Sequence, residues 1–122
     1  MQTFNLLTHK MIAGILFMSL LFSCQMKETT ELSSGSSDGN CTITISGTKN
    51  FGDPWQTTIT INAFKQKQQV VTEIYADGLT DKNIKFNWID NNHCIITISQ
   101  QDDTKRTFVV EATEQKIILR EQ

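Results

Sequence analysis

Apolar and polar residues alternate along seven short segments of this chain, and this period of two is the feature that most restricts the fold. In the first segment Cys41, Ile43 and Ile45 fall on one side, and threonine and serine hydroxyl groups fall on the other. The seven segments are 41–46, 55–63, 70–76, 84–88, 94–98, 108–110 and 117–119. They are rich in isoleucine, valine, threonine and aromatic residues, which is typical of β-strands that bury one face.

The connections between these segments predict antiparallel pairing. The gaps at 64–68 and 102–104 are polar and of hairpin length, and Asp77-Gly78 and 90–92 carry residues that tolerate left-handed turns. Parallel neighbours would need a long crossover connection. The sequence therefore predicts an all-β domain over 41–122, a small antiparallel meander of about seven strands. The period alone leaves a sandwich and a barrel equally open.

Residues 25–40 lack this alternation and are dominated by serine, threonine, glycine and acidic residues. Such a composition buries too little apolar surface to offset the entropy of ordering. The segment is therefore predicted to be a flexible linker, and sixteen flexible residues would span roughly 20–24 Å.

An uncharged apolar run, 11–22, follows Lys10 near the amino terminus. A bilayer-spanning helix needs roughly twenty apolar residues, so this run is short for a span and instead fits a secretory signal. The run ends in Leu21-Phe22-Ser23-Cys24. This motif resembles the lipobox of bacterial lipoproteins, in which an aliphatic residue, a tolerant position and a small residue precede the acylated cysteine.

The resemblance implies a lipoprotein signal peptide over 1–23 and a lipidated Cys24 at the head of the linker, 24–40. It places the protein in the cell envelope, attached to the membrane through palmitate-type acyl chains. Gln25 is not the aspartate that retains related lipoproteins at the inner membrane, so the outer membrane is the expected location, facing the periplasm or the exterior.

Cys41 and Cys94 remain once Cys24 is assigned to the lipid. Both fall in phase with the apolar residues of their own segments, and compartments outside the cytoplasm are oxidising. The two cysteines are therefore candidates for a disulfide, and two buried free thiols are the alternative.

The sequence offers no catalytic constellation, metal site or cofactor motif. His93 is the only histidine outside the leader and is expected in a surface turn. The loop aspartates lack the spacing of a known calcium loop. With 20% charged residues and a formal charge of −2, the chain is also not expected to bind nucleic acid.

Three aromatic residues, Phe51, Trp55 and Phe64, are candidate binding residues because exposed rings on loops stack on sugars or anchor protein partners. Closing one end of the core is the alternative role for Phe51 and Trp55. The sequence thus predicts a non-enzymatic binding module with a protein or glycan partner near the membrane. An inhibitor or immunity-type protein directed at a hydrolase, or an accessory subunit of an outer-membrane complex, are the alternatives.

Overall fold

The computed structural model of the chain describes residues 27–122. The expected signal peptide and Cys24 lie outside the described residues. Every regular element in the described part is a β-strand, and all pairings are antiparallel. The eight strands are β1 (Lys27–Gly35), β2 (Cys41–Asn50), β3 (Trp55–Ala63), β4 (Gln66–Ile74), β5 (Ile84–Asp90), β6 (His93–Ser99), β7 (Lys105–Ala112) and β8 (Ile117–Glu121).

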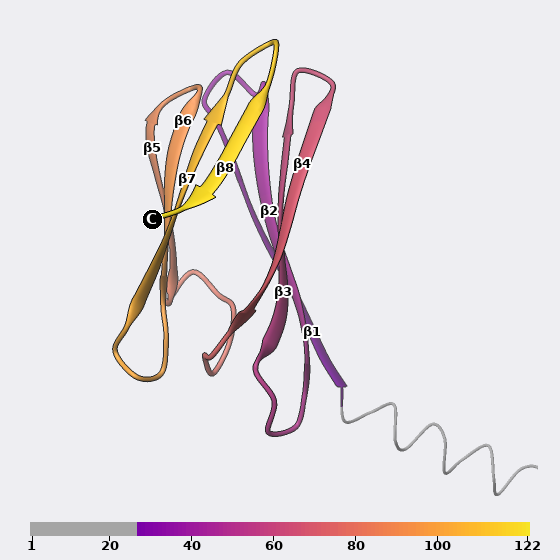
Figure 1. Ribbon diagram of the computed structural model, residues 1–122, viewed down its shortest axis with the longest axis vertical. Helices are drawn as coiled ribbons and strands as arrows, with labels where there is room; N and C mark the ends of the chain where they lie inside the picture. The colour runs from indigo at the N-terminus through magenta and orange to yellow at the C-terminus, as the bar shows by residue number, and fades with distance from the viewer. Residues whose placement is uncertain (1–26) are drawn as a thin grey trace, which may run out of the picture.

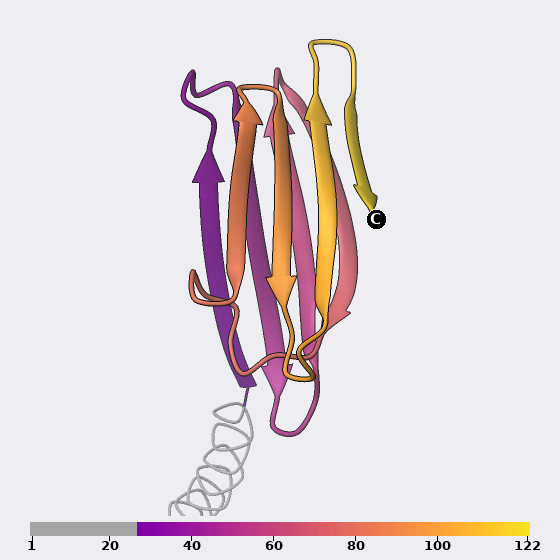
Figure 2. The ribbon, with the colours of Figure 1, turned by 90° about the vertical axis from the view of Figure 1, so that its left-hand side faces the viewer.

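The strands form two four-stranded meanders, β1-β2-β3-β4 and β5-β6-β7-β8, each in chain order. The two sheets lie face to face (Figure 1), and the crossover from β4 to β5 passes from one sheet to the other near the end at which β4 stops (Figure 2). No strand of one described sheet pairs with a strand of the other. The fold is therefore all-β, as the period of two predicted, and it is a sandwich rather than a barrel.

Polar contacts join the sheets on both sides of the sandwich. At one side the Trp88 indole N–H of β5 donates to Ser34 Oγ of β1 at 2.9 Å. At the other side the Arg106 guanidinium of β7 donates to the Glu73 carbonyl of β4 at 2.8 Å. The same guanidinium donates to both carboxylate oxygens of Glu121 at 2.6 Å. This pairing raises the pKa of Arg106 and lowers that of Glu121.

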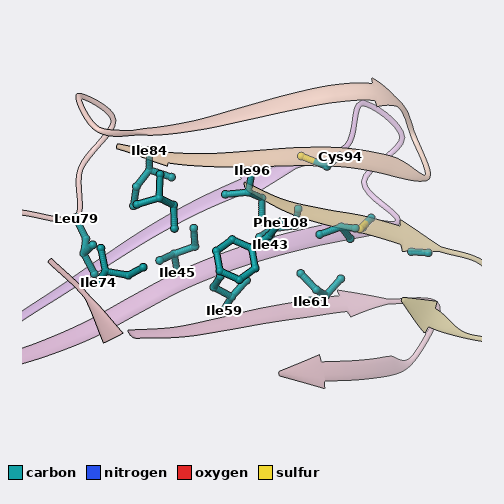
Figure 3. Packing of buried hydrophobic residues seen from close by; sticks show 14 of the residues in the cluster. Ile43, Ile45, Ile59, Ile61, Ile74, Leu79, Ile84, Cys94, Ile96 and Phe108 are labelled. Atoms are coloured by element: carbon teal, nitrogen blue, oxygen red, sulfur yellow. The ribbon is translucent and has the colours of Figure 1, made fainter. Parts of the chain in front are cut away.

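The core fills the space between the sheets with the inward side chain of every second residue. Its middle is built from isoleucines of both sheets around Phe108, as Figure 3 shows. The buried hydrophobic residues are Cys41, Ile43, Ile45, Trp55, Ile59, Ile61, Ala63, Ile74, Ala76, Leu79, Ile84, Cys94, Ile96, Ile98, Phe108, Val110 and Ala112. The alternation read from the sequence thus identifies the buried face of the strands correctly.

The predicted linker is wrong over Lys27–Gly35, which form strand β1 along the whole length of β2. Leu32 of this strand packs against the core, and Ser34 accepts the hydrogen bond from Trp88. A ladder with β2 satisfies the backbone groups of β1, so few apolar side chains suffice to hold it. Residues 36–40 then form a structured turn, in which Ser36 Oγ donates to Asp38 at 2.7 Å and accepts from the Cys41 N–H at 3.1 Å.

The crossover that follows β4 inserts Leu79 between the sheets, where it is 1% exposed. Trp55 Nε1 donates to the Ala76 carbonyl at 3.0 Å, and Thr30 Oγ1 donates to the Leu79 carbonyl at 3.3 Å. Gly47 of β2 leaves the space that Leu79 occupies, because a Cβ there would lie 2.6 Å from Leu79 Cδ1 and 3.2 Å from the Trp55 ring.

Replacing this glycine, Gly47→Ala, is therefore expected to lower the free energy of unfolding by about 1–3 kcal/mol, the usual cost of overpacking a core. The matched control is Gly35→Ala, where the nearest atom to a new Cβ is the Cys41 carbonyl oxygen at 3.8 Å. Equilibrium urea unfolding of both variants checks the prediction. Equal stability of the two variants would show that the crossover is not packed against β2 as described.

Candidate functional site

The structure does not bring the three candidate aromatic residues together. Trp55 is 3% exposed and belongs to the core, so it is not available to a ligand, contrary to the binding role considered from the sequence. Phe64 is half-buried against the core in the two-residue turn between β3 and β4, where Phe64 and Lys65 both have positive φ. Phe51 is 87% exposed in the turn between β2 and β3, at the opposite end of β3.

The surface that stands out instead is the outer face of the β1–β4 sheet. The register aligns its outward side chains in rows that cross all four strands. One row is Ser33, Thr44, Thr60 and Gln69, the next is Glu31, Ser46, Thr58 and Val71, and the third is Thr29, Thr48, Gln56 and Glu73. We call these twelve residues the hydroxyl face. Its side chains on β2 and β3 are all neutral and polar, and its carboxylates lie on β1 and β4.

A shallow depression of about 530 Å³ lies over the middle of the hydroxyl face. It is lined by Thr29, Thr30, Glu31, Ser46, Gly47, Thr48, Gln56, Thr58 and Val71. Some hydroxyl groups at the margin are already engaged, since Ser33 shares a hydrogen bond with Thr44 at 3.0 Å and Gln69 donates to Thr60 at 3.1 Å.

The hydroxyl groups in the middle of the face are not engaged in this way. Within the part of the chain that the structure describes, Ser46, Thr48 and Thr58 form no side-chain hydrogen bond with another residue. Each hydroxyl group can donate one hydrogen bond and accept two. The depression therefore presents neutral donors and acceptors on β2 and β3, the Glu31 carboxylate of β1, and the apolar side chain of Val71, which is 67% exposed.

The sequence reasoning did not single out this face, although its signal was present. The polar residues that alternate with the apolar ones at 41–46 and 55–63 are threonine, serine, asparagine and glutamine. Lysine and glutamate, which are common on solvated sheets, do not occur among them. The share of β1 in this face is not predictable from sequence, because the composition of residues 25–40 predicts a linker.

His93 lies at the start of β6 and is half-exposed, as a surface histidine should be. Its Nδ1 lies 2.7 Å and 2.9 Å from the two carboxylate oxygens of Asp90, and its Nε2 lies 3.5 Å from Glu111. The hydrogen bond to Asp90 raises the pKa of His93 and lowers that of Asp90. These contacts hold the β5–β6 turn, because the Asp90 carboxylate also accepts from the Asn92 N–H at 2.7 Å.

Cys41 and Cys94 lie on the inner faces of opposite sheets, in β2 and β6 respectively. Both are buried free thiols here, and the predicted disulfide is not formed in the structure. Burial raises the pKa of Cys94 to about 12, with a further contribution from Cys41, and burial likewise raises the pKa of Cys41. Both cysteines belong to the same buried cluster of the core.

Residues 27–122 contain no group of three or more histidine, cysteine, aspartate or glutamate residues placed to hold a metal ion. The same described stretch has no helix that is long and apolar enough to cross a membrane. Comparisons with protein-family models, curated proteins and solved structures found no match for the chain.

Proposed function

We propose that the protein is a bacterial lipoprotein of the cell envelope, attached through acyl chains on Cys24, and that its β-sandwich is a non-enzymatic binding module. The observation that carries the proposal is the motif Leu21-Phe22-Ser23-Cys24 at the end of an apolar run. The described domain begins three positions later, at Lys27. Gln25 in place of an aspartate favours the outer membrane over the inner one.

The ligand we propose for the module is a neutral glycan bound on the hydroxyl face. Unengaged hydroxyl groups of Ser46, Thr48 and Thr58 suit a polyhydroxyl ligand because both partners donate and accept hydrogen bonds. The Val71 side chain offers an apolar contact for the carbon–hydrogen face of a sugar ring. The absence of charge on the two central strands of the face favours a neutral sugar over an anionic one. A protein partner that covers this face is the alternative.

Acylation is tested by labelling bacterial cells that express the full chain with a fatty acid analogue. The expected result is a labelled protein in the membrane fraction for the parent chain and loss of the label for Cys24→Ser, because the thiol is the acylated group. The buried cysteines provide the control, since Cys94→Ser should retain the label. An unlabelled parent protein, or a label that persists in Cys24→Ser, would contradict the proposal.

Glycan binding is tested with an array of neutral oligosaccharides and a pair of matched variants. Thr58→Lys places a long charged side chain in the depression and is expected to weaken binding at least about tenfold, which corresponds to about 1.4 kcal/mol. Thr97→Lys is the control, because Thr97 is a half-buried threonine on the outer face of the other sheet, in strand β6. Equal binding by both variants, or binding of no glycan by the parent, would overturn the assignment of the face.

We further propose that Cys41 and Cys94 become a disulfide when the protein is exported to an oxidising compartment. Each thiol gives up one proton and one electron to a disulfide oxidase of the envelope, and a bond forms between the two sulfur atoms. The bridge would close a loop of about fifty residues and stabilise the fold by about 4 kcal/mol in the chain-entropy model. The burial of both thiols in one core cluster, on the inner faces of opposite sheets, supports the proposal.

The test is the mass of the intact protein isolated from the envelope under conditions that trap free thiols by alkylation. We expect a mass lower by two hydrogen atoms and no alkylation of Cys41 or Cys94 after unfolding. Reduction followed by the same treatment is the control and should add two alkyl groups. Two alkyl groups without prior reduction would show that the core keeps free thiols.

A further inference from the structure

Phe51 is a large apolar side chain that the fold leaves in water. It is 87% exposed, more than any other exposed large hydrophobic residue in the described part of the chain. It occupies the second position of a turn in which the Asp53 N–H donates to the Asn50 carbonyl at 3.0 Å, and Gly52 supplies a φ of +84° at the third position. This turn type requires glycine at that position, so the hairpin holds Phe51 at its tip.

The turn that carries Phe51 lies at the end of the sandwich where β1 begins. Lys27 is paired with Asn50 in the register of β1 and β2, so the first residue of β1 is adjacent to the start of the turn. Figures 1 and 2 both show the β2–β3 turn projecting beyond the other loops at this end. The exposed Tyr75 follows β4 at the same end, beside Asp53 and Pro54.

The sequence leaves little chain between this end and the proposed lipid anchor. Only Gln25 and Met26 separate Cys24 from Lys27. Three residue steps span at most about 11 Å, even when fully extended. An acylated Cys24 at the bilayer surface would therefore hold Lys27 within that distance of the lipid headgroups, with the β2–β3 turn beside it.

We infer that the β2–β3 turn is a second membrane contact, with Phe51 inserted at the boundary between headgroups and acyl chains of the bilayer that holds Cys24. This inference rests on the proposed acylation of Cys24. Aromatic side chains are favoured at this boundary. The Tyr75 hydroxyl group donates to the Glu73 carboxylate at 3.4 Å. Lys27 and Lys49 lie at the same end, together with the carboxylates of Glu28, which pairs with Lys49, and of Asp53 in the turn, so the charges there are balanced.

A second contact fixes the orientation of the domain. The strands run roughly along the long axis of the molecule, between the end with Phe51 and the end with the Phe64 turn (Figure 2). Insertion of the β2–β3 turn therefore stands the sandwich upright on the bilayer. The hydroxyl face is then perpendicular to the membrane plane. Its row of Thr29, Thr48, Gln56 and Glu73 lies nearest the membrane.

The experiment uses the full, processed chain purified from bacterial cells and reconstituted into vesicles of phosphatidylethanolamine and phosphatidylglycerol. A nitroxide is attached at Asp53→Cys, and electron paramagnetic resonance compares its collisions with lipid-soluble oxygen and with a water-soluble nickel chelate. Glu114→Cys is the control site, because it is exposed in the turn at the other end of the sandwich. Cys41 and Cys94 are buried and do not compete for the label.

We expect the label at 53 to meet oxygen more often than nickel, and the label at 114 to remain open to nickel. Adding Phe51→Ser to the Asp53→Cys chain should lower the ratio of inserted to free turn roughly tenfold, as expected for the loss of one buried phenylalanine. If the mass of the preparation shows that the acyl chains are present, two results would overturn the inference and leave the proposed anchoring intact. These are equal nickel access at both sites and no effect of Phe51→Ser. A mass without acyl chains would overturn it together with the proposed anchoring.

Discussion

The pairing of β1 with β2 determines how the rest of the protein is placed. Nine residue pairs, from Lys27 with Asn50 to Gly35 with Thr42, join the two strands. Without β1, β2 would be the edge strand of its sheet. The Trp88 indole of β5 would also lose its hydrogen-bond acceptor, Ser34. The same pairing replaces an expected spacer with folded structure up to Lys27, so it also determines how closely the proposed lipid anchor and the domain are coupled.

Two consequences for function follow from this one strand. The first is the width of the hydroxyl face, because β1 contributes Thr29 and Glu31 to the depression beside Ser46 and Thr48. The second concerns orientation, because only two residues would separate the domain from the proposed anchor on Cys24. With the proposed anchor, the hydroxyl face would be presented close to the membrane, which suits the proposed glycan if it is itself held at the membrane surface.

Much of the fold was predictable from the sequence, and the exceptions have physical reasons. Residues 55–63 were expected to be a strand and form β3, because five alternating residues there face the core. In β1 only Leu32 is apolar, and the strand is held by its ladder with β2, an interaction that its own composition does not reveal. Trp55 was assigned a possible binding role because an aromatic residue beside a loop is compatible with either exposure or burial. Its burial is decided by Ala76 and Leu79, which the crossover brings from a distant part of the chain.

Hydrogen exchange of the backbone amides in Lys27–Gly35 tests the central claim most directly, because a paired strand and a flexible linker differ strongly in protection. The account predicts that the β1 amides bonded to β2 exchange far more slowly than an unstructured chain, close to the rate of the amides in the middle of β2. Exchange at the unstructured rate throughout Lys27–Gly35, with β2 and β3 protected, would show that the segment is a linker. It would thereby remove the basis for both the width of the hydroxyl face and the close approach of the Phe51 turn to the membrane.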